Sequence, residues 1–283
     1  MNDMKNNIQN VQNEVFTDMC HASDNTFSNT EKEATNAMTK DFINMKRIQN
    51  SYGCALNNIR NVQNEAFTDM GHASNNTLLN TENETINAMT RAFDDALLST
   101  EREGVSELLE YLHTKTDFYT APASSKYHSA YKGGLLEHSL KVMNLLLQKM
   151  QNGIWQKYSV PTESLIISAL LHDLCKINMY VPTNKNVQEK NGKWRRKLTY
   201  TINDTEPYGH GEKSVMIASK FISLSNEEMY MIRWHMGFSL PKEVYPTLQN
   251  ALRKHPSILA IMEADTEAAY LNEDEDGKPE SFF

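Results

Sequence analysis

Residues 165–176 read LIISALLHDLCK, an apolar run that ends in an adjacent histidine and aspartate, His172 and Asp173. The run predicts a buried helix, and the pair stands where that helix emerges. An imidazole and a carboxylate side by side suit a divalent metal such as manganese, iron or zinc. The chain has nine histidines, so chance can supply one such pair, and the pair can also simply end a helix.

Further residues of ligand type surround this pair in the sequence: His138, His210, His235 and Asp265. Asp265 lies within an otherwise apolar predicted helix, and a buried carboxylate needs a hydrogen-bonding partner or a cation. His138 also stands among apolar residues, where a core histidine with satisfied hydrogen bonds is the commoner alternative. The pattern therefore indicates a metal site without requiring one.

Length, net charge and cysteine content limit the classes of protein to which this chain can belong. The chain has 283 residues and a formal net charge of −8, which argues against a general nucleic-acid coat but allows a local basic groove. Its three cysteines show no CxxC spacing, as is typical of a reducing compartment. We find no signal-peptide pattern and no apolar run of membrane-spanning length. We expect a soluble, cytoplasmic protein without a membrane partner.

The first 102 residues contain a direct repeat. Residues 6–42 recur as residues 57–93 with 26 of 37 positions identical, and the first proline is Pro122. Apolar residues in the repeats follow a narrow stripe that is typical of a coiled-coil seam. The many Asn and Thr residues favour the alternative of a weakly ordered polar spacer. We expect a long-helix, coiled-coil-like arm over residues 1–102 that makes the protein a homo-oligomer.

From about residue 103 the composition becomes that of a folded domain. Apolar spacing predicts helices over residues 105–113, 135–151, 162–177, 212–222, 226–235, 245–254 and 257–271. Residues 186–189 and 193–202 flank an Asn-Gly pair, which predicts a β-hairpin. Ser225 and Glu228 have the spacing of a helix capping box. The expected fold is all-α with one inserted β-hairpin, and residues 273–283 form an acidic tail.

Five short motifs follow one another in a specific order: GGLLEHS, LLHDLCK, GHGEKS, RWHMG and EAD. This order, over about residues 105–272, resembles the HD-domain metal-dependent phosphohydrolases. It is most similar to the HD domain of the 3′-to-5′ exoribonucleases of Gram-positive bacteria and to small HD hydrolases of phages and clostridia. The resemblance implies that residues 103–272 form an HD-domain helical bundle. Cys175 departs from the family pattern, which usually has glycine or another small residue there, but the family does not use this position as a ligand.

The resemblance also implies which residues hold metal. It assigns the ligands of an HD metal site to His138, His172, Asp173 and Asp265, and two extra ligands of binuclear members to His210 and His235. Asp173 matches the residue that bridges two ions. We expect two divalent ions, which could be manganese, iron, magnesium, cobalt, nickel or zinc, and a single ion is the alternative.

Asp173 and Lys176 are the candidate catalytic residues. Two divalent ions would lower the pKa of a water molecule and polarise the phosphoryl oxygens. Lys176 is expected one helical turn after His172, where it could neutralise charge on the phosphate or leaving group. Without the resemblance, a lysine that interacts with the helix dipole is the simpler interpretation.

Candidate substrate-binding residues are all basic: His128, Lys132, Arg195, Arg196 and Arg233. Arg195 and Arg196 follow Trp194 on the predicted hairpin, which would bind phosphates and stack on a base if it overhangs the metal site. Charges that protect an exposed strand edge are an equally supported alternative. Arg233 either reaches the site or makes a core salt bridge.

The expected function is hydrolysis of a phosphate ester by metal-activated water. The substrate would be a nucleotide, a cyclic or linear oligonucleotide, or an RNA end, so the partner is a phosphate-containing small molecule, a nucleotide or a short nucleic acid. Some HD-fold proteins instead use a di-iron centre to oxygenate small polyols or phosphonates, which is one alternative. A non-catalytic nucleotide-binding or scaffold protein is the other.

Overall fold

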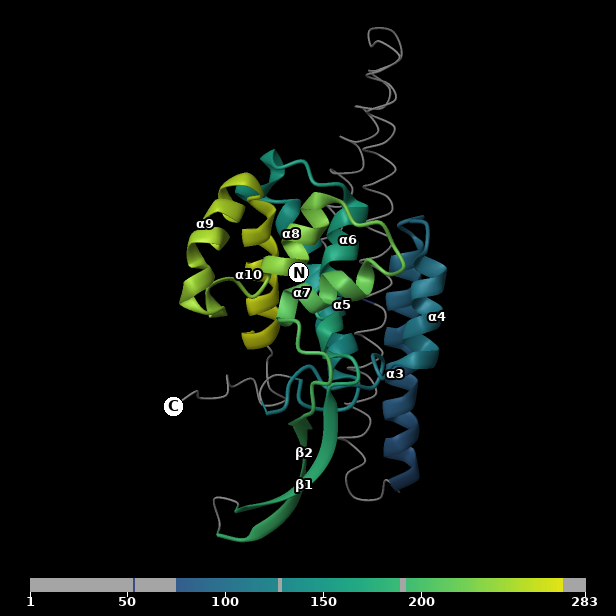
Figure 1. The fold of residues 1–283 in the computed structure, drawn as a ribbon. Helices are drawn as coiled ribbons and strands as arrows, with labels where there is room; N and C mark the ends of the chain where they lie inside the picture. The colour runs from purple at the N-terminus through teal and green to yellow at the C-terminus, as the bar shows by residue number, and fades with distance from the viewer. Residues whose placement is uncertain (1–52, 54–74, 127–128, 189–191, 272–283) are drawn as a thin grey trace, which may run out of the picture. The chain divides into compact units, whose positions relative to one another are not determined.

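The computed structural model describes residues 53, 75–126, 129–188 and 192–271 (Figure 1). This part of the chain is mostly helical and contains a two-stranded antiparallel sheet, so the expectation of a mostly α fold with an inserted hairpin is confirmed. The first repeat, residues 57–74 of the second repeat and the acidic tail lie outside the described residues. The coiled-coil-like arm, its role in oligomerisation and the tail therefore stay predictions.

The helices and strands are, in chain order, α3 (Asn75–Leu98), α4 (Val105–Lys115), α5 (Gly134–Met150), α6 (Thr162–Leu171), β1 (Tyr180–Gln188), β2 (Trp194–Ile202), α7 (His210–Ala218), α8 (Asn226–Trp234), α9 (Tyr245–Lys254) and α10 (Ser257–Tyr270). Short 3-10 turns lie between them: η1 (Gly153–Lys157), η2 (Leu174–Lys176), η3 (Gly237–Ser239) and η4 (Lys242–Val244). Among these helices we find none with both the length and the apolar surface that crossing a bilayer requires.

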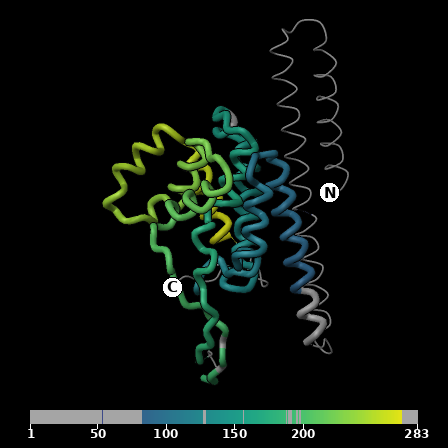
Figure 2. The backbone as a smooth tube through the Cα atoms, turned by 45° about the vertical axis from the view of Figure 1, so that its right-hand side comes forward, coloured from purple at the N-terminus to yellow at the C-terminus, as the bar shows by residue number. Residues whose placement is uncertain are grey.

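Helix α6 forms the centre of the core because its sequence has no polar face. Its residues from Ser164 to Leu171 are all buried. Helix α5 packs against α6 and α10, α8 packs against α6, and α3 lies across α5 and α6 (Figures 1 and 2). Phe93 and Leu97 of α3 are fully buried, and the Phe93 ring lies 4.8 Å from the Phe118 ring. The core thus includes the end of α3, which lies before residue 103.

The α-helix predicted over residues 162–177 is shorter than expected. It ends at Leu171, and after Asp173 the chain continues as the 3-10 turn η2. The Lys176 N–H donates to the Asp173 carbonyl, three residues earlier, rather than to the carbonyl four residues earlier. Burial is the same on both sides of this change, so apolar spacing alone did not reveal it. The His172–Asp173 pair therefore lies at a junction between two kinds of helix.

A close approach between chain segments fixes the start of α5. Gly133 adopts a left-handed φ of +81°, and a Cβ atom on Gly134 would lie 2.0 Å from the Ser129 carbonyl oxygen. Only glycine fits both positions without a shift of the backbone. The helix that carries His138 therefore begins at a tightly packed point.

The hairpin is longer than its sequence pattern suggested. Its first strand begins at Tyr180 rather than near residue 186, and the pairing runs from Tyr180 opposite Ile202 to Gln188 opposite Trp194. Pro182 fits within β1 because both strands of a two-stranded ribbon are edge strands. Figures 1 and 2 both show the ribbon leading away from the helices.

A buried ion pair connects the α3–α4 turn to α8. The carboxylate of Glu228 is fully buried and accepts hydrogen bonds from Arg102 at 2.8 and 3.2 Å and from the Ser164 hydroxyl at 2.7 Å. The predicted capping box is confirmed, because Ser225 and Glu228 exchange hydrogen bonds at the start of α8. Burial opposes ionisation, but Arg102 and Ser164 outweigh it and lower the pKa of Glu228.

Replacing Arg102 with leucine is expected to destabilise the protein by about 2 kcal/mol, since it leaves a buried carboxylate without its cation. The pKa of Glu228 is lowered by folding, so the stability it contributes is present above its unfolded pKa and is lost as pH falls through the folded value. The cost of Arg102→Leu should therefore shrink in acid. Urea unfolding at neutral pH and at about pH 3.5 measures both effects.

Glu163 provides the control for this prediction, because it also pairs with Arg102 but is half exposed. Glu163→Gln should change the free energy of unfolding by less than about 1 kcal/mol. An Arg102→Leu cost no larger than that of Glu163→Gln would contradict a stabilising role for the buried pair.

Candidate metal centre

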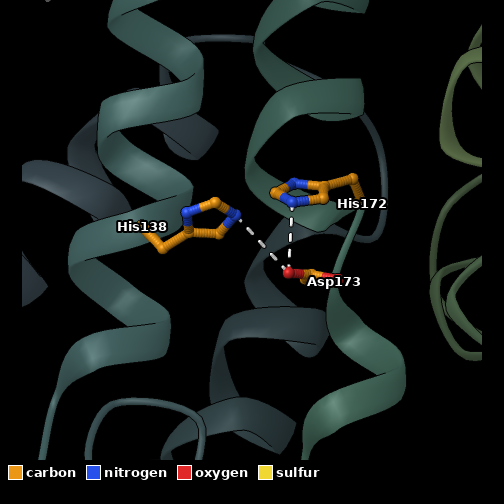
Figure 3. A group of neighbouring side chains, drawn as sticks. All are labelled: His138, His172 and Asp173. Atoms are coloured by element: carbon orange, nitrogen blue, oxygen red, sulfur yellow. Dashed lines mark ion pairs between the residues drawn. The ribbon is translucent and has the colours of Figure 1, made fainter. Parts of the chain in front are cut away.

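Six side chains of ligand type, predicted from the sequence, come together around Asp173. They are His138 on α5, His172 at the end of α6, Asp173 before η2, His210 at the start of α7, His235 at the end of α8 and Asp265 on α10. All but His210 and Asp265 are almost fully buried. Figure 3 shows His138 and His172 converging on the Asp173 carboxylate from neighbouring helices.

The two oxygens of Asp173 face different pairs of histidines. Oδ2 lies 3.2 Å from His172 Nε2 and 3.6 Å from His138 Nε2. Oδ1 lies 2.8 Å from His210 Nε2 and 3.6 Å from His235 Nε2. Asp173 thus stands between two pairs of histidine nitrogens, one pair facing each carboxylate oxygen.

Asp265 completes the group on the Oδ2 side. Its Oδ1 lies 2.9 Å from His138 Nε2 and 3.8 Å from His172 Nε2. Burial opposes ionisation of Asp265, yet the hydrogen bond and charge of His138 lower its pKa. The sequence-based expectation that this carboxylate needs a partner inside its apolar helix is therefore met by His138.

Backbone hydrogen bonds orient two of the histidines in the same way. His172 Nδ1 donates to the Ala169 carbonyl and His235 Nδ1 donates to the Ile232 carbonyl, each at 2.7 Å. A carbonyl only accepts, so Nδ1 carries the proton and Nε2 of the neutral ring presents a lone pair. Neither Nε2 atom has a hydrogen-bond partner among the described residues. Buried lone pairs of this kind fit a metal ion, whose histidine ligands are commonly oriented by such backbone contacts.

The charges within the site follow from burial and from Asp173. Burial, reinforced by the rings of His172 and His210, lowers the pKa of His235 to about 3, so this ring is neutral at neutral pH. Burial of the His210 ring opposes its protonation, but its hydrogen bonds to Asp173 and Cys175 raise the pKa of His210 to about 10. Burial likewise opposes ionisation of Asp173, and the positive charge of Lys176 outweighs it, which holds the pKa of Asp173 well below its usual range.

Lys176 lies beside the centre but reaches it differently from the sequence-based expectation. It belongs to the 3-10 turn η2 rather than to a continuous helix with His172. Its Nζ lies 2.7 Å from Asp173 Oδ2. Burial opposes protonation, but Asp173 raises the pKa of Lys176, so the lysine stays charged. A permanent cation therefore stands next to the Asp173 carboxylate.

Cys175 has a position that the sequence analysis did not anticipate. Its buried Sγ lies 3.3 Å from His210 Nδ1 and 3.6 Å from His210 Nε2. Asp173, Cys175 and His210 each offer an atom within 4.8 Å of the others, as three ligands of one ion would. The two-residue spacing from Asp173 was visible in the sequence, but the contact with His210 depends on the packing of η2 against α7.

Of the candidate substrate-binding residues, the structure describes the side chains of Lys132, Arg196 and Arg233, and these three make separate contacts. Lys132 pairs with Asn83 and Glu82 on α3, at 3.2 and 3.6 Å. Arg233 makes a salt bridge with Glu212 and lies over the Trp234 ring, but this pair is partly exposed rather than in the core. Arg196 is exposed two residue pairs from the ribbon's closed end. His128 and the side chain of Arg195 lie outside the described part of the chain.

A close contact between α7 and α8 holds His210 and His235 in place. A Cβ atom on Gly211 would lie 2.2 Å from the Arg233 carbonyl oxygen. We expect Gly211→Ala to push the helices apart and to lower any metal-dependent activity about tenfold, because small shifts of site residues are costly. Met216→Ala, on an exposed position of α7, is the control. Equal activity of the two variants would show that this contact does not position the site.

Comparison with known proteins gives a limited match. A 63-residue segment is 40% identical to the dihydroneopterin 2′,3′-cyclic phosphate phosphodiesterase of Methanocaldococcus jannaschii. This segment covers 22% of the chain and 25% of that enzyme. No protein-family model and no solved structure matches the chain.

Proposed function

We propose that the protein is a metal-dependent phosphohydrolase of the HD-domain type, with residues 103–272 as its catalytic domain. The observation that carries this proposal is the position of Asp173, whose two oxygens each face a separate pair of histidines. A carboxylate between two clusters of imidazoles suits two divalent ions. The partial similarity to a cyclic phosphate phosphodiesterase supports phosphate-ester chemistry from an independent direction.

The residues of the site have two different proposed roles, which are metal binding and stabilisation of negative charge. His138, His172 and Asp265 would hold one ion, His210 and His235 the other, and Asp173 both. Divalent ions in such a site lower the pKa of water and polarise phosphoryl oxygens. Asp173 would hold the two ions next to each other by binding both. Lys176 would supply a fixed positive charge beside the reacting phosphate. The bond that breaks joins phosphorus to the leaving ester oxygen.

The substrate class in this proposal is a phosphate ester of a nucleotide, a cyclic or linear oligonucleotide, or an RNA end. A cyclic phosphodiester has additional support from the name of the similar enzyme, which acts on a 2′,3′-cyclic phosphate. The exposed Trp194 and Arg196 of the hairpin would contact a longer substrate rather than the scissile phosphate, because the ribbon leads away from the helices (Figure 1).

The direct test uses the full-length protein, stripped of metal with a chelator and then supplied with manganese, zinc, iron(II) or cobalt(II). We expect hydrolysis of bis-p-nitrophenyl phosphate and of a 2′,3′-cyclic nucleotide only after a metal is added. Hydrolysis that is indifferent to the chelator would overturn the proposal. Oxygen uptake with iron, without any esterase activity, would replace it with an oxygenase.

A further inference from the structure

The two sides of the candidate metal centre are unequal. On the Oδ2 side of Asp173, three further side chains face one another: His138, His172 and Asp265. On the Oδ1 side two histidines of the described part of the chain, His210 and His235, face the carboxylate. The thiol of Cys175 lies on this second side, against the His210 ring.

From this asymmetry we propose that Cys175 Sγ is a protein ligand of the ion on the Oδ1 side, together with Asp173, His210 and His235. The inference rests on the proposed metal-dependent function and deepens it. It makes the second position a mixed site of two imidazoles, one carboxylate and one thiolate. Such a donor set selects zinc, iron(II) or cobalt(II) over magnesium or manganese, because thiolate is a soft ligand.

Two separations on this side are close to those around a tetrahedral ion, whereas His210 Nε2 and Asp173 Oδ1, at 2.8 Å, would have to move apart slightly when an ion binds between them. With metal–nitrogen and metal–sulfur bonds of about 2.0 and 2.3 Å, two such ligands of a tetrahedral ion lie roughly 3.5 Å apart. Cys175 Sγ and His210 Nε2 are 3.6 Å apart, but Sγ lies nearer to Nδ1, at 3.3 Å, so the thiol must swing from beside the ring toward Asp173 Oδ1 to bind the same ion as Nε2. With two bonds of about 2.0 Å, a nitrogen and an oxygen ligand lie roughly 3.3 Å apart, and His235 Nε2 and Asp173 Oδ1 are 3.6 Å apart.

A second observation points independently to a cation at this place. His235 Nε2 is buried, faces Asp173 Oδ1 and has no hydrogen-bond partner among the described residues. Its tautomer is fixed by the Nδ1 hydrogen bond to Ile232, so Nε2 presents a lone pair to this side of the site. A buried lone pair without a donor is costly, and a metal ion removes that cost.

The backbone holds Cys175 on the Oδ1 side of Asp173, next to His210. Asp173 and Cys175 are two residues apart, at the start of and within the turn η2, which packs against α7. The Cys175 N–H donates to the Ser214 hydroxyl at 3.0 Å, and Ser214 follows His210 by one turn of α7. The turn that carries the thiol is therefore tied to the helix that carries His210.

The test is cobalt(II) titration of the full-length, metal-stripped protein, followed by absorption spectroscopy. A bond between thiolate and cobalt(II) gives an intense near-ultraviolet charge-transfer band, which nitrogen and oxygen ligands do not give. We expect this band in the wild type and its loss in Cys175→Ser. We also expect the zinc affinity of Cys175→Ser to fall at least about tenfold and its manganese affinity to stay unchanged.

The double variant Cys20→Ser, Cys54→Ser is the matched control, because it retains Cys175 as the sole cysteine of the chain. The band must persist in this variant, which tests the inference even if Cys175→Ser does not fold. Cobalt binding without a thiolate band, or a band that survives Cys175→Ser, would overturn the inference while leaving a metal-dependent hydrolase intact. Failure of the wild type to bind any cobalt would instead overturn the proposed function as well.

Discussion

Replacement of Asp173 by asparagine is expected to lower phosphodiester hydrolysis by about a thousandfold or more. Asp173 is the side chain that faces both histidine pairs, with oxygens at 2.8 Å from His210 and 3.2 Å from His172. An amide keeps the shape of the carboxylate but has no negative charge and only one oxygen. Neither group of ligands then keeps the anion it needs to hold a divalent ion.

The measurement combines hydrolysis rates with metal content after equilibrium dialysis. The matched control is Asp204→Asn. Asp204 is not one of the six candidate ligands, and its ion pair with Lys213 has the same 2.7 Å length as the ion pair between Asp173 and Lys176. This control should keep its metal and its rate. Hydrolysis by Asp173→Asn at a rate near that of Asp204→Asn would exclude Asp173 as the bridging ligand.

Asp265→Asn distinguishes a bridging carboxylate from a terminal one. Asp265 faces His138 and His172, at 2.9 and 3.8 Å, and thus belongs to one side of the site. We expect this variant to lose one ion and to keep the ion on the side of His210. If Asp173→Asn and Asp265→Asn lose metal equally, the proposed division into two sides is wrong.

Some of this site could be predicted from the sequence, because ligand-type residues in apolar surroundings have few structural uses. The six candidate ligands were identified by their types and by the order of their motifs, and the structure brings them together. The hairpin was predicted from its Asn-Gly turn, and the start of α8 from the Ser225–Glu228 capping box. The turn and the capping box each depend on residues that are close in the sequence, so both can be predicted without knowing how the chain packs.

Other features depend on contacts between distant segments, and the sequence does not encode them in a local pattern. Helix α6 ends at Leu171 although the next four residues, 172–175, are as buried as those within the helix. The approach of Cys175 to His210 joins residues 35 positions apart and requires η2 to pack on α7. Periodicity reports which residues are buried, but not which buried side chains meet.

The second large effect is expected for Lys176→Met, which should lower the rate of hydrolysis about a hundredfold without loss of metal. Lys176 lies beside Asp173 Oδ2 at 2.7 Å, and it is not a ligand because a protonated amine has no lone pair. Its removal leaves all six candidate ligands in place. The rate falls because no fixed cation then offsets the charge that builds up on the phosphate and the leaving oxygen.

Lys213→Met is the matched control, since Lys213 is an equally buried lysine in an ion pair with Asp204. Both variants lose the same side chain from a similar environment, so a difference in their rates reports on position rather than on folding. Lys176→Arg should recover part of the rate, because it restores the charge with a different shape. Equal rates for Lys176→Met and Lys213→Met would mean that Lys176 serves only to balance the charge of Asp173. Removing a cation from beside Asp173 strengthens the attraction of that carboxylate for a divalent ion, so electrostatics alone predict that Lys176→Met keeps its metal. A loss of metal in this variant would therefore mean that Lys176 positions Asp173 for metal binding, and it would contradict the view that the lysine acts on the substrate.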